Sequence, residues 1–204
     1  MYDSSQGSFY GPENSLSFLY LQKSREMTIQ FYKYQGTGND FILIDNREQA
    51  ITLTHEQVAF LCHRRFGIGG DGLMLLERAG DDDFKRVYYN SDGGESTMCG
   101  NGGRCITAFA QRLGIISRQA HFVAIDGAHD AVINEDNTVS LHMQDVHEIN
   151  AADGHTILNT GSPHYVQWVN DVQNTDVFTE GKRIRNQDAF QPKGINVNFV
   201  QLQG

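Results

Sequence analysis

Several features that would place this chain in a broad class of proteins are missing from its sequence. Its apolar stretches are all shorter than the about 20 residues that cross a bilayer, so we expect no transmembrane helix. Basic residues are in the minority, with 16 Lys and Arg against 25 Asp and Glu, and the net charge of −9 disfavours nucleic acid and anionic membrane surfaces as partners. The first residues lack the basic start and cleavage site of a secretory signal. We therefore expect a cytoplasmic location.

Cysteine is also scarce, and the three residues Cys62, Cys99 and Cys105 are too few and odd in number for a disulfide framework. None of them has the two-residue spacing of a zinc or redox site, so no metal is expected. Free thiols in a reducing compartment are the better interpretation. Cys62 and Cys105 fall on or beside the apolar faces of predicted helices, and we interpret both as packing residues.

The remaining composition, 39% hydrophobic and 20% charged, is typical of a globular protein, and 204 residues allow one sizeable core or two small ones. Residues 1–26 have no clear periodicity and are expected to be a poorly ordered appendage. We predict a first domain over residues 27–145. Residues 146–204 are then a partial second domain, since about 59 residues are few for an independent one.

Short strands and two helices make up the predicted elements. Thr54 and Gln57 form a capping box, which predicts a helix that ends near Phe66 and Gly67. A second amphipathic helix is predicted over 104–113, closed by Gly114. Strands are predicted at 28–33, 41–44, 73–76, 86–89, 122–125, 131–133, 139–143, 157–160, 165–169 and 195–200. The fold class is α/β, in the mixed α+β sense.

The segment from Asn90 to Cys105 is the most informative in the chain, because it places a thiol at the start of a helix. Its glycines leave backbone N–H groups unobstructed beside Cys99. A helix N-terminus carries roughly half a positive charge and can lower the pKa of a cysteine from about 8.5. It therefore stabilises an anion, either a substrate carboxylate or the Cys99 thiolate. Cys99 is a candidate base, and the alternative is a small buried hydrophobic residue.

Three other segments have simpler interpretations. Residues 67–72 match the glycine pattern of a dinucleotide site, but a helix precedes them and a strand follows, which is the reverse of what that site requires. We predict a tight helix-to-strand turn there instead, and a solvated turn at residues 81–83. The polar loops 35–40 and 160–165 are either plain turns or parts of a site.

Five landmarks together resemble the diaminopimelate epimerase family from Met27 to Gly204. They are Lys33 to Phe41, Phe66 to Gly72, Asn90 to Cys105, Gly161 to His164, and Gly194 to Val200. The third landmark carries Met-Cys-Gly-Asn-Gly-x-Arg-Cys after Asn-x-Asp-Gly and is highly specific.

The resemblance implies two similar domains, each a small sheet or barrel around a central helix, with the second incomplete. It also implies the epimerisation of LL-2,6-diaminopimelate to meso-diaminopimelate, in lysine and peptidoglycan precursor synthesis. No cofactor and no metal takes part, and a homodimer is implied. Cys99 resembles one of two catalytic thiols on opposite faces of the substrate α-carbon, one removing a proton while the other returns one.

Substrate-binding roles carry over to five further positions by the same resemblance. Asn39, Asn90 and Asn196 resemble substrate-binding amides. Gly100 and Asn101 resemble the donors that hold the reacting α-carboxylate at the helix start, where charge develops as the α-proton leaves.

Other positions depart from the family pattern. His164 resembles a group beside the catalytic thiols, but many members have asparagine where Ser162 stands and glutamine where Gly72 stands. The family continues past Asn196 with a Glu-Arg-Gly segment and an Ala-Cys-Gly loop that carries the second thiol. The 204 residues contain neither, so we expect a truncated chain that lacks normal two-base turnover.

Two alternatives stay open at this point. A proline racemase-like or phenazine-pathway isomerase has a related fold, although proline racemase-like proteins have histidine where Asn101 stands. A non-catalytic amino-acid-binding remnant is the second alternative, since half a cleft can still hold a carboxylate.

Overall fold

The computed structural model describes residues 28–97, 99–152 and 154–203, and the predicted appendage at residues 1–26 lies outside them. The chain divides into two units, one up to His142 and one from Met143, and each is described by itself. The domain boundary predicted after residue 145 stays a prediction. No helix in the described ranges is long and apolar enough to cross a membrane.

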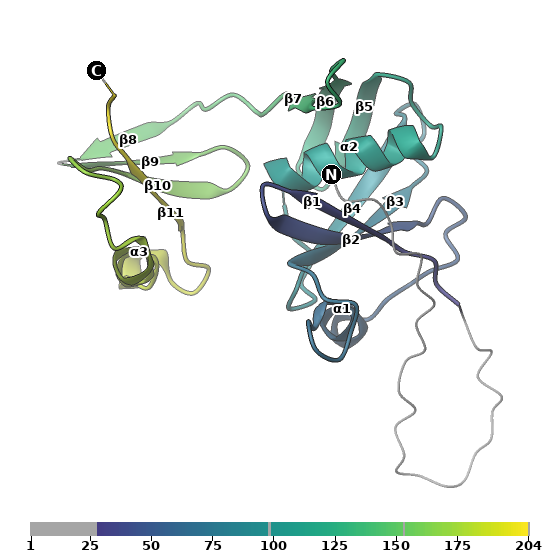
Figure 1. The fold of residues 1–204 in the computed structure, drawn as a ribbon, viewed down its shortest axis with the longest axis horizontal. Helices are drawn as coiled ribbons and strands as arrows, with labels where there is room; N and C mark the ends of the chain where they lie inside the picture. The colour runs from purple at the N-terminus through teal and green to yellow at the C-terminus, as the bar shows by residue number, and fades with distance from the viewer. Residues whose placement is uncertain (1–27, 98, 153, 204) are drawn as a thin grey trace, which may run out of the picture. The chain divides into compact units, whose positions relative to one another are not determined.

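The first unit is one sheet with two helices (Figure 1). Its elements are β1 (Tyr32–Gly36), β2 (Asn39–Asp45), α1 (His55–Cys62), β3 (Gly72–Glu77), β4 (Phe84–Asn90), α2 (Gly100–Arg112), β5 (Gln119–Ala124), β6 (Gly127–Ile133) and β7 (Val139–Leu141). The strands lie in sequence order across the sheet. The pairs β2–β3 and β4–β5 are parallel, and the other neighbours are antiparallel.

Strands β2 and β3 are buried on both faces, which explains their continuous apolar runs. Because successive side chains of a strand alternate, Phe41 and Leu43 pack in the cluster with α2, whereas Ile42 and Ile44 pack in the cluster with α1. The two helices therefore cover opposite faces of the sheet.

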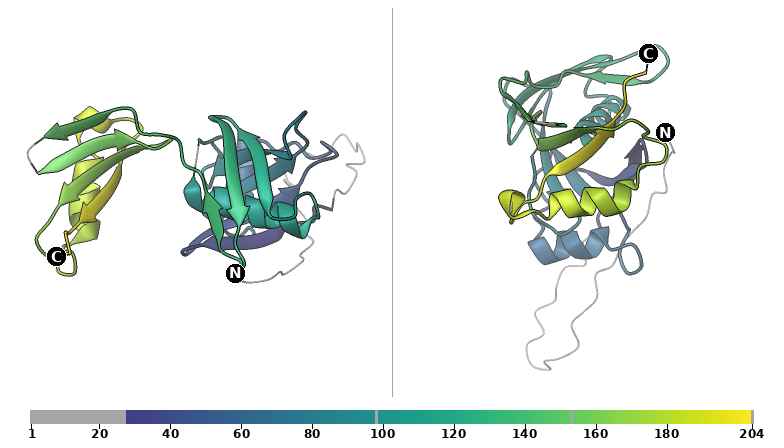
Figure 2. Two further views of the ribbon diagram at one scale, coloured as in Figure 1. Left: turned by 90° about the horizontal axis from the view of Figure 1, so that it is seen from above. Right: turned by 90° about the vertical axis from the view of Figure 1, so that its left-hand side faces the viewer.

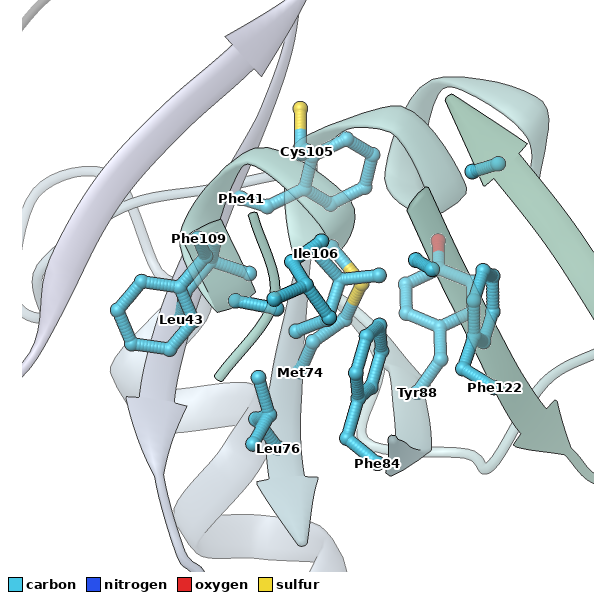
Figure 3. Close-up of a cluster of buried hydrophobic side chains, with 14 of the residues drawn as sticks. Phe41, Leu43, Met74, Leu76, Phe84, Tyr88, Cys105, Ile106, Phe109 and Phe122 are labelled. Atoms are coloured by element: carbon cyan, nitrogen blue, oxygen red, sulfur yellow. The ribbon is translucent and has the colours of Figure 1, made fainter. Parts of the chain in front are cut away.

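The sheet curls around α2, which contacts strands at both of its ends, β1 and β7 (Figure 2). Figure 3 shows the resulting core, in which Ile106 and Phe109 of α2 lie among Met74, Phe84 and Phe122 of the strands. These side chains are fully buried. The expected architecture of a small curled sheet around a central helix is confirmed.

Helix α1 begins as predicted and ends earlier than predicted. The Thr54 hydroxyl accepts from the Gln57 N–H at 3.3 Å, and the Gln57 side chain accepts from the Thr54 N–H at 2.8 Å. The helix ends at Cys62 because the next residue, His63, turns to an extended backbone conformation. Its Nδ1 then accepts from the backbone N–H groups of Arg65 and Phe66, both at 3.2 Å.

The first hairpin corrects the predicted strand and loop. The strand predicted at 28–33 runs over Tyr32–Gly36, and the loop predicted at 35–40 is a turn at Thr37 and Gly38. Both turn residues have positive φ, 54° and 86°, as a two-residue hairpin turn that matches the strand twist requires. Asn39 therefore lies on a strand, where its direction is fixed, and not on a loop.

The sheet has a narrow seam between β4 and β5. These strands pair at Phe84 with Phe122 and at Lys85 with Val123. The rings of Phe84 and Phe122 stack with their centroids 4.9 Å apart. The strands β1–β4 and β5–β7 thus form two blocks that meet along a short junction, and α2 contacts both blocks.

At the predicted turn 81–83, polar contacts of His121 on β5 join the two blocks of strands. The His121 N–H donates to Asp83 Oδ2 at 2.7 Å, and the Asp83 N–H donates to the His121 carbonyl at 2.8 Å. The imidazole lies 2.6 Å from Asp130 Oδ1 and 3.2 Å from Asp82 Oδ1. The hydrogen bond and charge of Asp130 raise the pKa of His121 above its ordinary value of 6.5, with smaller contributions from Asp82 and Asp83.

Replacing His121 by glutamine should destabilise the first unit in a pH-dependent way. Because the folded-state pKa is raised, the stabilisation by the imidazolium is fully present below pH 6.5 and is lost as pH rises through the folded pKa. Urea midpoints of parent and His121→Gln should therefore differ most below pH 6.5 and converge at higher pH. A difference that grows with pH would contradict this.

The second unit is a four-stranded sheet with one α-helix (Figure 1). Its elements are β8 (Ile149–Ala152), β9 (His155–Asn159), β10 (Pro163–Trp168), α3 (Val177–Arg185), the 3-10 helix η1 (Asp188–Phe190) and β11 (Asn196–Val200). The strand order is β11-β10-β9-β8, with β10 and β11 parallel and α3 in the connection between them. Strands β9, β10 and β11 were predicted; β8, α3 and η1 were not.

Candidate active site

Cys99 is the N-cap residue of α2. Its backbone is extended, with φ −124° and ψ 114°, and its sulfur accepts from the Gly102 N–H at 3.5 Å. Gly102 has little room for a side chain, since a Cβ there would lie 3.3 Å from Met74 Sδ. The half-buried Cys99 sulfur therefore lies at the positive end of the helix, next to a backbone donor, as the sequence predicted.

Two of the predicted amides lie against this thiol. Cys99 Sγ is 3.6 Å from Asn39 Oδ1, and Asn101 Nδ2 donates to the same oxygen at 3.4 Å. Asn101 Oδ1 in turn accepts from the Arg104 guanidinium and from the Thr37 hydroxyl, the latter at 3.2 Å. The turn of the first hairpin and the first turn of α2 thus meet at the thiol, with Gly100 in the backbone between Cys99 and Asn101.

A network of charged groups lies behind Asn39. Asp71 Oδ2 accepts from Asn39 Nδ2 at 2.8 Å, and Asp71 Oδ1 accepts from Arg64 at 2.7 Å. Asp40 forms ion pairs with Arg64 at 2.6 Å and with Lys33 at 2.7 Å. Partial burial alone would raise the pKa of Asp40, but hydrogen bonds and charges from Arg64 and Lys33 bring it well below its ordinary value.

Gly72 and Asn90 lie opposite each other in the β3–β4 pair. A Cβ at Gly72 would lie 2.6 Å from both Tyr88 Cε2 and the Tyr89 carbonyl oxygen, so in this chain aromatic packing occupies the space of a side chain. Asn90 is exposed at the end of β4, and the next residue, Ser91, donates its N–H to the Asp71 carbonyl at 3.1 Å. Asn90 is thereby tied to the same loop that holds Asn39.

A buried cation from β4 lies near the thiol. The Arg86 side chain is fully buried, with Nη2 3.4 Å from the Thr97 carbonyl oxygen and 4.0 Å from Asp126, and the guanidinium lies 5.7 Å from the Tyr88 ring centroid. Burial lowers the pKa of Arg86, and charges on Asp126, Cys99 and Tyr88 oppose that shift. Among the described residues, Arg86 Nε and Nη1 have no hydrogen-bond partner.

The other two cysteines are buried, as their predicted packing roles require. Cys62 packs in the cluster with α1, and burial raises the pKa of its thiol to about 11. Cys105 packs in the cluster with α2, and burial raises the pKa of its thiol to about 12. Both thiols are therefore protonated near neutral pH and poor nucleophiles.

In the second unit, the structure brings together two of the three predicted residues. His164 and Asn196 are paired in the parallel register at the start of β10 and β11. His164 Nδ1 lies 3.0 Å from Asn198 Nδ2, which also donates to the Tyr165 carbonyl at 3.3 Å. Ser162 lies in the turn before β10, after Gly161, whose φ is +100°.

The sequence reasoning missed three residues that contact the predicted ones: Asp71 and Arg104 in the first unit, and Asn198 in the second. Asp71 was part of the glycine pattern, but its partner Asn39 lies 32 residues away in the chain. Arg104 was part of a predicted helix, but its contact with Asn101 depends on α2 beginning at Gly100. Asn198 had one available signal. It stands two residues after Asn196, and alternate residues of a strand share a face.

The model of the family described as diaminopimelate epimerase matches residues 31–148. A diaminopimelate epimerase of Flavobacterium psychrophilum is 55% identical over 173 residues, which cover 84% of this chain and 68% of that protein. A diaminopimelate epimerase of Chlorobaculum tepidum is 45% identical over 175 residues, which cover 82% and 68%. The match therefore spans about two thirds of the length of these relatives.

Solved structures support the fold. A Bacillus anthracis phenazine biosynthesis protein of the PhzF family has a TM-score of 0.54 and 14% identity, over 69% of this chain and 56% of that one. At this identity the similarity shows a shared fold and no shared reaction.

Proposed function

Because the chain belongs to the diaminopimelate epimerase family, we propose that it carries the Cys99 half of a cofactor-independent epimerase site for 2,6-diaminopimelate. The observation that carries the proposal is the position of Cys99, half-buried at the N-terminus of α2 with Asn39 and Asn101 against it. The reaction converts the LL form to the meso form by inverting one α-carbon.

In the proposed step, the Cys99 thiolate removes the α-proton and becomes a thiol. The electron pair left on the α-carbon is delocalised into the α-carboxylate. We assign that carboxylate to the backbone N–H groups of Gly100 and Asn101 at the helix start, where the helix dipole opposes the growing negative charge. A thiol on the opposite face then gives a proton to the carbon, which completes the inversion.

The thiol for the opposite face is not one of the other two cysteines of the chain. Cys62 and Cys105 are buried in the two core clusters, and the pKa of each is raised. The proposal therefore assigns the second base to a group outside the 204 residues. By itself, the chain should produce no normal two-base turnover.

The remaining residues are proposed to hold the substrate. Asn39, Asn90 and Asn196 are assigned to its polar groups, and His164 to a place beside the thiols. Gly72 is assigned no contact through a side chain, since the Tyr88 ring takes that space.

We also propose a cytoplasmic location and a homodimer. The odd number of unpaired cysteines favours a reducing compartment. The homodimer rests on the family resemblance alone.

Competition between diaminopimelate and a thiol reagent tests the proposed site. Iodoacetamide should alkylate Cys99 much faster than Cys62 or Cys105 near neutral pH, because the latter two thiols are buried and protonated. Millimolar diaminopimelate should slow alkylation of Cys99 severalfold, and proline and lysine should not. Protection by proline but not by diaminopimelate would favour a proline racemase-like isomerase instead.

A further inference from the structure

The carboxylate of Asp71 connects the charged network to the thiol. Asp71 lies between α1 and β3, and its two oxygens accept from Arg64 at 2.7 Å, from Asn39 Nδ2 at 2.8 Å and from the Asp40 N–H at 3.1 Å. A carboxylate can only accept hydrogen bonds.

The orientation of the Asn39 amide follows from this chemistry. Because Asp71 accepts and cannot donate, Asn39 must direct its NH2 group towards Asp71. Its carbonyl oxygen is then left to face the opposite way, towards Cys99 Sγ at 3.6 Å. Turning the amide over would place two acceptor oxygens against each other.

Asn101 is held in the complementary orientation. The Arg104 guanidinium can only donate, so Asn101 must direct its carbonyl oxygen towards Arg104 and the Thr37 hydroxyl. Its NH2 group then faces Asn39 Oδ1 at 3.4 Å. Both amides are therefore fixed by charged side chains outside the thiol's immediate contacts, and the atom that Asn39 presents to the sulfur is an acceptor.

An acceptor next to sulfur favours the thiol over the thiolate, because a thiol can donate its proton to Asn39 Oδ1 and a thiolate cannot. The Gly102 N–H, 3.5 Å from the same sulfur, favours the thiolate. We propose that Asp71 is a positioning residue that, through Asn39, keeps an acceptor oxygen against Cys99 Sγ and so slows the reaction of the resting thiol with electrophiles. This rests on the proposed function only in that Cys99 is the reactive thiol of the site.

Other charged or titratable groups also interact with Cys99 and must stay constant in a test. Arg86 and Tyr88 of β4 and Cys105 of α2 are of this kind. Among the described contacts, none of the three is hydrogen-bonded to Asp71 or to Asn39, but the charge of Asp71 acts on Tyr88, so a control for charge is needed. A substitution at Asp71 that keeps its size therefore changes the Asn39 contact while leaving these groups in place.

The test is the pH dependence of Cys99 alkylation by iodoacetamide in Asp71→Asn. Asparagine can donate as well as accept, so the side chain at position 71 no longer fixes which end of the Asn39 amide faces the sulfur. The longer contact from Asn101 Nδ2, at 3.4 Å, still favours the original orientation but holds it less firmly. Alkylation of Cys99 at neutral pH should become up to about tenfold faster. An unchanged profile would overturn the proposal.

Two controls separate this effect from a change in charge alone. Asp40→Asn removes a carboxylate from the same Arg64 network without touching the Asn39 side-chain amide, and should change the Cys99 rate by less than about twofold. In an Asn39→Ala background, the Asp71→Asn effect should disappear. If it persists there, Asp71 acts through its charge and the proposal is wrong.

The buried cysteines report in the same experiment whether each variant is folded. Cys62 and Cys105 should stay unreactive in a folded variant. If Asp71→Asn fails to fold, Asn39→Ala alone decides the matter, because it removes the acceptor and should also speed the alkylation of Cys99. A failure of diaminopimelate protection would count against the proposed function and leave this result unaffected.

Discussion

Cys99→Ser is expected to exchange the α-proton of diaminopimelate with solvent about a thousandfold more slowly than the parent chain, since a general base contributes about two to four powers of ten. A serine hydroxyl at the same N-cap position keeps the hydrogen bond to the Gly102 N–H, but it is not ionised near neutral pH. Deuterium uptake at the α-carbon in D2O, followed by NMR or mass spectrometry, measures the rate.

Exchange by the parent chain should also be one-sided. A single thiolate reaches one face of the α-carbon, so deuterium should enter one configuration while the ratio of LL to meso forms stays constant. Cys62→Ser is the matched control, because Cys62 is buried away from the site in the cluster with α1, and its exchange rate should equal the parent's. Equal losses in both variants, or full epimerisation by the 204-residue chain, would contradict the prediction.

Gly67→Ala is expected to destabilise the first unit by about 3 kcal/mol or more, as a severe overpacking substitution. A Cβ at Gly67 would lie 2.0 Å from the Phe60 carbonyl oxygen and 2.6 Å from the Leu61 carbonyl oxygen, both in the backbone of α1. Backbone atoms cannot rotate aside as a side chain can. The loop would have to leave α1 and break the Ile68 N–H bond to the Leu61 carbonyl.

Pulsed alkylation of Cys62 and Cys105 during urea unfolding measures this effect in the first unit alone, since both thiols are buried there. Gly80→Ala is the matched control. No atom lies within 4 Å of the Cβ that it would add, so its urea midpoint should stay near the parent's, within about 0.5 kcal/mol. Similar midpoints for both variants would show that the α1 backbone yields to the added methyl group.

Much of the first unit could be predicted from local sequence patterns. The capping box of Thr54 and Gln57 acts over three residues and marked the start of α1 correctly. The end of α1 could not be found in this way, because it depends on the His63 ring accepting backbone N–H groups. The start of α2 was predicted four residues late, because its first turn is rich in glycine. Glycine has low helix propensity, but at Gly102 close packing against Met74 favours it.

The second unit was harder to predict, because its strands are short and more of their residues are exposed. Every residue of β8 is exposed, so the strand has no apolar alternation that would indicate it. In α3, Ile184 is the buried residue, and a single apolar anchor is a weak helical pattern. Strand pairing, and not local periodicity, forms β8, whereas α3 begins at a local N-cap, where Asp176 Oδ1 accepts from the Thr179 N–H at 3.1 Å.

In the candidate site, local sequence features identified the thiol but could not identify its long-range contacts. Cys99 could be recognised as an unusual thiol from its glycines and from the helix that follows it. The contact of Asn39 with Asp71 spans 32 residues, and that of Asn39 with Cys99 spans 60. The first pair comes together through the register of β2 and β3, and the second through the packing of α2 against β1 and β2, and no spacing in the sequence specifies either. The family resemblance supplied Asn39, and the structure supplied the groups that orient it.

The seam between β4 and β5 has a consequence for how mutations and local opening affect the protein. The thiol, its two amides and Asp71 all belong to α2 and the block of β1–β4. Strands β5, β6 and β7 join that block through two strand residue pairs, the contacts of His121 with Asp82 and Asp83, and α2. Free energies of local opening differ between such blocks. We therefore expect the second block, apart from Asp126 beside Arg86, to accept substitutions with little change in the chemistry of Cys99, and to open transiently in hydrogen exchange.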